Sequence, residues 1–425
     1  EMQKKIFYNE TILVLLLLYF LFFFGFYFNE DANGGSINDW KYNKFLINSF
    51  LNDFQYTFLN YDQYSTRHSP VFLILLSFLY KLNLTETTVR FLNLNFSLIS
   101  VLFFYKCLIL KYKEIDKNYL YLISFIFLIS PTFRSLSIWP GTRIFGFHFF
   151  IISTFFYLKF IYEEKKIIYC YLNIIFLAIA SYCSVNFCLF SIYFFYKFFS
   201  YYKFSLNIFY LIILNVFLAF PAYYYLFILD VFYIFAAGPG DITNSFSDVK
   251  NIFYFNVTDK ILIIPTIIVF YFLPILLGKK KLFINKINII EIIILSFFVL
   301  ILIQFFGYKT EFTGGGIILH ISSIIFKNHY LFYFFSFLSL LLIYDLSKNN
   351  FNNLFLILIL FFTNPQISIY HKYYDPLIIF FVFLLFEFEI KKSFFRYQNI
   401  IYIYMYYAAF LFISIFKNQI ENFFI

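Results

Sequence analysis

The sequence predicts an all-α fold, a polytopic bundle of about thirteen transmembrane helices that forms a single integral-membrane domain over residues 1–425. Hydrophobic residues make up 62% of the chain and charged residues only 13%, whereas soluble domains carry about 25% charge. Long apolar runs recur, among them 11–28, 261–277 and 289–306. Lysines gather between these runs at alternate connections, which is typical of cytoplasmic loops.

We expect spans at 11–28, 91–110, 119–133, 144–161, 167–182, 184–201, 205–228, 260–277, 289–307, 329–345, 352–363, 375–388 and 399–416. Lys4 and Lys5 place the N-terminus in the cytoplasm. Segment 68–82 is apolar enough to cross, but a crossing there would turn the later lysine clusters outward. We therefore interpret it as a re-entrant or half-buried segment on the outer side. The alternative is that this segment does cross the membrane and that a second crossing elsewhere, not recognised in the sequence, restores the orientation of the later loops.

Three connections on the outward side are long: 29–90, 230–259 and 307–329. The first contains Trp40–Leu59, whose apolar residues fall near one helical stripe, as expected of a helix lying on the membrane surface. The net charge of +9 suits anionic lipid on the cytoplasmic side. Membrane lipids are therefore expected partners, and no nucleic-acid motif is visible.

Only five of the 32 basic residues are arginine, and four of them fall on the outward side in this topology: Arg67, Arg90, Arg134 and Arg143. The positive-inside rule gives no reason for cations there. Arginine has a planar, permanently charged fork that suits phosphate and carboxylate groups. These four residues therefore indicate a site for an anionic headgroup.

The first outward connection begins with acidic residues, including Asp31 and Asp39, around the pair Gly34-Gly35. A carboxylate at the membrane surface can act as a general base or hold a divalent cation beside a phosphate. A solvated turn is the plain alternative. The connection closes with Arg67-His68-Ser69-Pro70, where Arg67 and His68 can donate hydrogen bonds to phosphate oxygens and Pro70 suits the first turn of a helix.

Two further polar segments interrupt the apolar chain. Segment 130–143 carries Arg134 and Arg143 among hydroxyl residues, which suits a diphosphate or a phosphodiester, although helix-end anchoring would explain it too. Segment 364–376 gathers polar groups at an expected helix entry, where such groups are costly and usually functional: His371, Lys372, Tyr373 and Asp375. These residues are candidates for substrate contact or for interfacial anchoring.

In order along the chain, these features resemble the GT-C superfamily of membrane glycosyltransferases, in particular the dolichyl-phosphate-mannose mannosyltransferase and aminoarabinose transferase group. Asp39 followed by His68-Ser69-Pro70-Val71 resembles the acid and the His/Lys-Pro-Pro-Leu element of those relatives. The turn at 130–143 resembles the element after their third span. The chain departs from the pattern because no second acid follows Asp39 and because Ser69 stands at the position of the first Pro.

The resemblance implies inverting transfer of a sugar from a polyprenyl-phosphate donor to a lipid or glycan acceptor, on the periplasmic or lumenal face of a membrane. From the composition we expect a bacterial inner membrane, with the site facing the periplasm. Asp39 would be the base, with Asp31 as alternate base or cation contact; the sequence does not name a metal. The residues expected to bind the donor phosphate are Arg67, His68, Arg134 and Arg143. The expected substrate pocket contains His371, Lys372, Tyr373 and Asp375.

Two alternatives stay open. An O-antigen-type polymerase or ligase would place its key Arg and His residues in the later loops and would not need the first one. A flippase for lipid-linked sugars would need ionisable residues deep within helices. Few are visible, with Glu291 as one candidate, and most charges stand at helix ends. That distribution favours an enzyme working at the interface.

Overall fold

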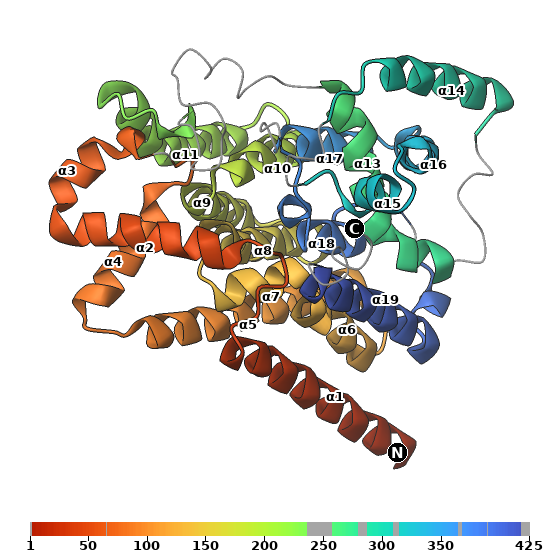
Figure 1. The fold of residues 1–425 in the computed structure, drawn as a ribbon, viewed down its shortest axis with the longest axis horizontal. Coiled ribbons are helices and arrows are strands. Elements are labelled where there is room, and N and C mark those ends of the chain that lie inside the picture. The colour runs from red at the N-terminus through yellow and green to blue at the C-terminus, as the bar shows by residue number, and fades with distance from the viewer. Residues whose placement is uncertain are drawn as a thin grey trace. The chain divides into compact units, whose positions relative to one another are not determined.

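The computed structural model describes residues 2–64, 66–235, 257–278, 287–308, 314–363, 368–388 and 390–417. The chain divides into two compact units. Unit 1 comprises Glu1–Leu128 and Phe133–Ile252, and unit 2 comprises Ile129–Thr132 and Phe253–Ile425. The described residues contain helices and connections but no strands, which confirms the all-α prediction (Figure 1).

The helices of unit 1 follow the chain as α1 (Met2–Tyr27), α2 (Ser36–Asn52), α3 (Phe54–Leu59), α4 (Pro70–Lys81), α5 (Glu86–Lys111), α6 (Lys117–Ser124), most of α7 (Pro131–Ile138), α8 (Thr142–Tyr162), α9 (Ile167–Cys183), α10 (Phe190–Tyr202) and α11 (Leu206–Tyr223). Short 3-10 turns join several of them: Tyr61–Gln63, Phe125–Ile129, Val185–Leu189 and Tyr233–Phe235. A π-helical turn, Tyr224–Ile228, extends α11 just after Pro221.

Unit 2 contains α13 (Val257–Gly278), α14 (Ile289–Gln304), α15 (Ile317–Ile325), α16 (Tyr330–Ser347), α17 (Phe351–Phe362), α18 (Leu377–Leu384) and α19 (Tyr397–Ile415). The 3-10 turns His371–Tyr373 and Lys392–Phe394 precede α18 and α19. The segment Ile129–Thr132, which includes the first two residues of α7, packs with this unit.

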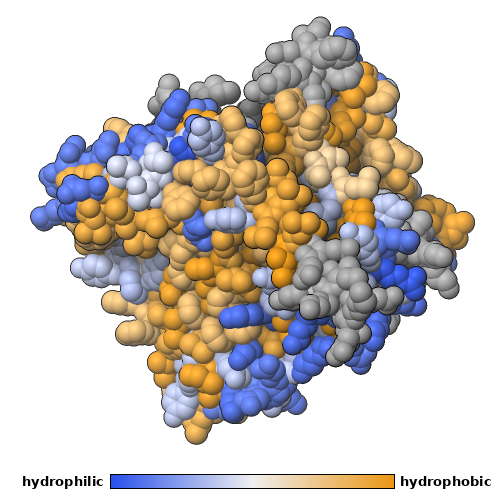
Figure 2. Space-filling model, turned by 90° about the horizontal axis from the view of Figure 1, so that it is seen from below, coloured by the Kyte–Doolittle hydropathy of each residue, from blue (hydrophilic) through white to orange (hydrophobic). Residues whose placement is uncertain are grey.

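Among the described residues, six helices are long and apolar enough to cross a membrane: Glu86–Lys111, Thr142–Tyr162, Leu206–Ile228, Val257–Leu276, Tyr330–Ser347 and Tyr397–Ile415. A seventh span results if the bent pair Lys117–Ile129 and Pro131–Ile138 counts as one. Figure 2 shows a face on which hydrophobic residues predominate and hydrophilic residues gather near the margins. The chain is thus an all-helical integral membrane protein, whereas the count of about thirteen spans stays a prediction.

The expected span at 119–133 differs most from the structure. The chain there bends by 66° between two short helices. Pro131 stands at the first position of α7, where its missing N–H interrupts the helical hydrogen bonds to the preceding turn. All side chains from 126 to 140 are buried, so the part of this element around the bend is buried in the protein.

The first outward connection is mostly helical. The expected surface helix Trp40–Leu59 corresponds to α2 and α3, which meet at Asp53. Trp40 and Phe50 of α2 are buried, whereas Phe45 is exposed. Segment 68–82 forms the short helix α4, which is capped by Ser69 and is too short to be counted among the spans.

Two of the other expected spans are also shorter than predicted. The expected span 375–388 contains only the eight-residue, fully buried α18. The expected span 184–201 begins with a 3-10 turn, so α10 starts at Phe190. Parts of other predicted features lie outside the described residues, namely 236–256 of the second loop, 279–286 with its lysines, 309–313 of the third loop and 364–367.

A close helix contact organises unit 1. Gly146 of α8 lies against α9, and a Cβ atom at this position would come within 2.9 Å of the Ala180 carbonyl oxygen. The aromatic rings of Phe150 and Phe187 stack beside it at 5.0 Å. Because α5 and α9 both pack on α8, this contact fixes the scaffold from which the first connection and segment 133–143 are held.

Candidate functional site

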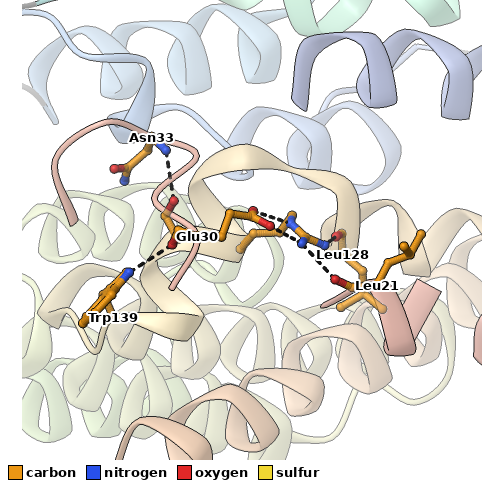
Figure 3. Close-up of polar contacts among 7 residues, drawn as sticks. Leu21, Glu30, Asn33, Leu128 and Trp139 are labelled. Carbon is orange, nitrogen blue, oxygen red and sulfur yellow. Dashed lines mark hydrogen bonds and ion pairs between the residues drawn. The ribbon is translucent and has the colours of Figure 1, made fainter. Parts of the chain in front are cut away.

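Unit 1 holds six of the predicted site residues, and Arg134 is the most completely engaged of them. Its Nε atom donates to Glu30 Oε1 at 2.7 Å, and its Nη2 atom donates to Glu30 Oε2. Nη1 donates to the Leu128 carbonyl at 3.0 Å and Nη2 also to that of Leu21 at 3.1 Å (Figure 3). The side chains of this ion pair are only 5% and 10% exposed. Arg134 thus turns its guanidinium toward protein oxygens.

The ion pair fixes the start of the first connection. Trp139 Nε1 donates to the Glu30 carbonyl at 3.0 Å, and the backbone N–H of Asn33 donates to Ser135 Oγ at 2.9 Å. Gly25 of α1 makes room for this arrangement, because a Cβ atom there would lie 2.6 Å from Arg134 Nη2 and closer still to the Glu30 carboxylate. Segment 134–139 therefore holds residues 30–33 at three points.

Asp31 begins α2. Its Oδ1 atom accepts the N–H groups of Gly35 at 3.3 Å and Ser36 at 3.0 Å, and its Oδ2 atom accepts that of Ile37 at 3.3 Å. A carboxylate at a helix N-terminus satisfies free N–H groups and interacts favourably with the helix dipole. Asp39 lies half-buried in the first turn of the same helix.

The structure brings the His68 element beside segment 139–143. His68 Nδ1 lies 3.2 Å from Thr142 Oγ1, at the start of α8 and next to Arg143. Ser69 Oγ donates to the Tyr182 carbonyl and also caps α4. His68 is exposed and Arg67 half-buried, so the two expected phosphate-binding elements meet at an accessible place.

Asp375 in unit 2 is almost fully buried, at 2% exposure. Its Oδ1 atom accepts the Ser130 hydroxyl at 2.7 Å, and its Oδ2 atom accepts the Thr132 N–H at 2.9 Å. The carboxylate therefore caps the N-terminus of α7. This contact joins two of the segments that the sequence singled out, 130–143 and 364–376.

His371 organises a second cluster in unit 2. Its Nε2 atom accepts the N–H of Ile317, the first residue of α15, at 3.0 Å, so the neutral ring carries its proton on Nδ1. Nδ1 lies 3.3 Å from the Tyr271 hydroxyl, to which it donates. Burial, with nearby His320 and Lys417, lowers the pKa of His371 from 6.5 to about 3. His371 is therefore a neutral cap of α15.

The glycine run before α15 is a tight turn against His371. Gly314, Gly315 and Gly316 have φ values of +129°, +89° and +85°, which side chains other than glycine rarely adopt. A Cβ atom on Gly314 would lie 2.8 Å from the Ile369 carbonyl. The Gly315 N–H donates to the same carbonyl at 2.8 Å. The third loop thus packs on segment 369–371.

The remaining predicted residues of unit 2 are half-buried. The Lys372 ammonium lies 5.1 Å from the ring centre of Tyr370, and the rings of Tyr370 and Tyr373 meet at 5.6 Å. This is a cation–aromatic group of the kind found at membrane interfaces.

The sequence alone does not single out two residues that the structure makes central. Glu30 is one of several acids in a polar turn, and Gly25 is one small residue in an apolar run. Gly25 could have been noticed, because a glycine inside a long apolar helix often indicates that another part of the protein packs closely against it. Within the described ranges, no group of three or more His, Cys, Asp or Glu residues is placed to hold a metal ion.

No protein-family model, no curated protein and no solved structure matches this chain.

Proposed function

We propose that the chain is a GT-C-like membrane glycosyltransferase, which moves a sugar from a polyprenyl-phosphate donor to a lipid or glycan acceptor with inversion. The observation that carries the proposal is the contact of His68 with Thr142, 3.2 Å apart. It joins Arg67-His68 to Arg143 close to the surface, and the same connection carries two candidate bases. A leaving phosphate requires cations and hydrogen-bond donors near the departing charge, together with one base.

In this proposal Asp39 deprotonates the acceptor hydroxyl. Asp31 is the less suitable base because its oxygens already accept three backbone N–H groups. Arg67, His68 and Arg143 bind the donor phosphate. Arg134, whose guanidinium is occupied by Glu30 and two carbonyls, contributes by holding the first connection in place. A divalent cation beside Asp31 or Asp39 is compatible with this scheme.

The proposal includes a topology of about thirteen spans, in which the shorter apolar helices also cross a bacterial inner membrane. The first connection then faces the periplasm. His371, Lys372, Tyr373 and Asp375 line the pocket for the acceptor or carrier, where His371 and Asp375 already hold the starts of α15 and α7.

The test uses purified full-length protein and a pool of polyprenyl-phosphate sugars labelled in the sugar. Sugar release is compared for the wild type, Asp39→Asn, Asp31→Asn and Asp31→Ala. We expect Asp39→Asn to lower the rate at least about 100-fold, the usual contribution of a general base. Asp31→Asn should remain active because asparagine also caps helices, whereas Asp31→Ala should lose part of its activity through the start of α2.

Asp62→Asn is the matched control, since Asp62 is an exposed acid of the same connection. Donor consumption that is equal in all variants would remove Asp39 from the chemistry. Failure of the folded wild type to consume any donor, with lipid-linked oligosaccharide still bound, would overturn the transferase proposal in favour of a polymerase or flippase.

A further inference from the structure

Arg90 is the one outward arginine that the proposed function does not use. It stands in the second turn of α5 and is 8% exposed. Its Nε atom donates to the Ile138 carbonyl at 3.2 Å, and its guanidinium carbon lies 3.5 Å from the ring centre of Trp139 and 5.3 Å from that of Phe26. Aromatic contact and one hydrogen bond therefore hold the guanidinium in a fixed orientation.

One nitrogen of this guanidinium lacks a hydrogen-bond acceptor among the described residues. Nη2 of Arg90 is buried and has no hydrogen-bond partner among the described residues. Glu86, one turn earlier, has other partners: its oxygens accept hydrogen bonds from Trp40 Nε1 at 2.7 Å and from Lys44 Nζ at 2.6 Å. A buried charged donor without an acceptor costs about 1–3 kcal/mol or more, so such a group needs a partner from outside the chain, such as a water molecule or an anion.

Two hydroxyl groups in the same region share this property. The Tyr80 hydroxyl at the end of α4 and Ser137 Oγ are buried and have no partner within the described part of the chain. Tyr80 lies close enough to Arg90 for the two side chains to interact electrostatically. Ser137 directly precedes Ile138, whose carbonyl accepts the hydrogen bond from Arg90. All three groups can donate a hydrogen bond, and an acceptor-rich anion is the kind of ligand that such donors bind.

The charge balance and the position both suit an anion. Arg90 and Lys44 carry two positive charges against the single negative charge of Glu86. Arg90 is near the first residue of the membrane-length helix Glu86–Lys111, where lipid headgroups lie. The only two tryptophans of the chain are here as well, since Trp40 binds Glu86 and Trp139 contacts Arg90. Tryptophan is typical of the headgroup level of a membrane.

We propose that Arg90, Tyr80 and Ser137 form a binding site for a phosphate group, and that a membrane phospholipid supplies it. The guanidinium edge and the two hydroxyls bind the phosphate oxygens, and the lipid tails lie along the apolar surface of α5. The oxygens of free inorganic phosphate can accept the same hydrogen bonds, so the experiment must distinguish the two ligands. The site is independent of the sugar transfer proposed above, because none of its three residues takes part in it.

Because both tryptophans contact residues of this region, their fluorescence can report the binding of a ligand. Tryptophan emission of the full-length protein in neutral detergent is titrated with short-chain phosphatidylglycerol, with diacylglycerol and with inorganic phosphate. The variants are Arg90→Lys, which keeps the charge but loses the fork, and Tyr80→Phe, which removes a hydroxyl that has no hydrogen-bond partner among the described residues and is therefore expected to fold. Arg396→Lys is the control, because Arg396 is an exposed arginine in unit 2.

We expect saturable binding of phosphatidylglycerol, about tenfold weaker in Arg90→Lys and in Tyr80→Phe and unchanged in Arg396→Lys. Competition by inorganic phosphate in the wild type would show that the phosphate group alone is sufficient. Lipid binding without such competition would show that the whole headgroup is recognised. Equal binding of diacylglycerol, or affinities that Arg90→Lys and Tyr80→Phe leave unchanged, would overturn the proposal.

Discussion

At the scale of single residues, the Glu30–Arg134 pair shows how an apolar chain holds two buried charges. Removing one partner of such a pair leaves an uncompensated charge, which usually costs about 3–5 kcal/mol. The pair here is further satisfied by the carbonyls of Leu21 and Leu128, so every nitrogen of the guanidinium has an acceptor. Gly25 is the residue that lets α1 approach this closely.

We therefore predict that Gly25→Ala destabilises the protein by about 1–3 kcal/mol, because the added methyl group would overlap the ion pair. The measurement is the unfolding midpoint in detergent. Gly35→Ala is the matched control, since a Cβ atom at that position would meet no atom within 4 Å and the φ of −168° there lies outside the left-handed region. Equal midpoints for the two variants would contradict the packing argument.

The sequence identified Arg134 as unusual but could not show what it binds. Its scarcity in a lysine-rich chain indicated a specific role, and phosphate was the natural hypothesis for an outward arginine. The partner Glu30 lies 104 residues away, and no local pattern reports a contact over that distance. His68 and Thr142 illustrate the same limit, because their contact depends on how α4 and α8 pack.

At the scale of elements, several helices begin at a cap supplied from elsewhere in the chain. Asp375 caps α7, and His371 caps α15. In both cases the cap is far from the helix in sequence, so the helix start depends on tertiary packing. The sequence predicted the polar segment 364–376 as a site, but these capping roles could not be seen without the fold.

The cap on α15 predicts a dependence on pH. The pKa of His371 is about 3 in the folded protein and 6.5 when unperturbed. The unfolded chain therefore takes up the proton first as pH falls, and stability present above pH 6.5 is lost toward pH 3, by at most roughly 1.4 kcal/mol per pH unit. His371→Gln, whose amide oxygen can accept the Ile317 N–H without titrating, should reduce this loss.

Unfolding midpoints of the wild type and of His371→Gln at about pH 7 and about pH 5 test this expectation. His68→Gln is the control, because His68 is an exposed histidine. A loss of stability between these pH values that is the same in all three proteins would show that another group is responsible.

At the scale of the whole molecule, long apolar runs placed most of the described helices within a few residues, including α5, α8, α13, α16 and α19. It was less successful where a proline or a polar segment interrupts an apolar run, as at Pro131 and before α18. Hydropathy measures the composition of a segment but not its local bending, so the broken pair at 117–138 looked like one span.

The topology makes a prediction for the intact membrane. With Cys188, an exposed native cysteine, replaced by Ser, single cysteines are introduced by Gly35→Cys and Glu164→Cys. An impermeant maleimide added to intact cells should label position 35 at once. It should label position 164, an exposed residue of a lysine-rich connection, only after permeabilisation. The reverse pattern would invert the assigned orientation.

The buried pair of Glu30 and Arg134 also has a consequence for biosynthesis. Glu30 is synthesised 104 residues before Arg134, so the connection after α1 leaves the ribosome with a carboxylate whose partner does not yet exist. In the folded protein both charges are buried, and a buried charge that lacks its partner is costly. Burial of the start of the first connection is therefore expected to wait for the synthesis of α7. The order of translation, and not hydropathy alone, then governs how the first third of the chain assembles.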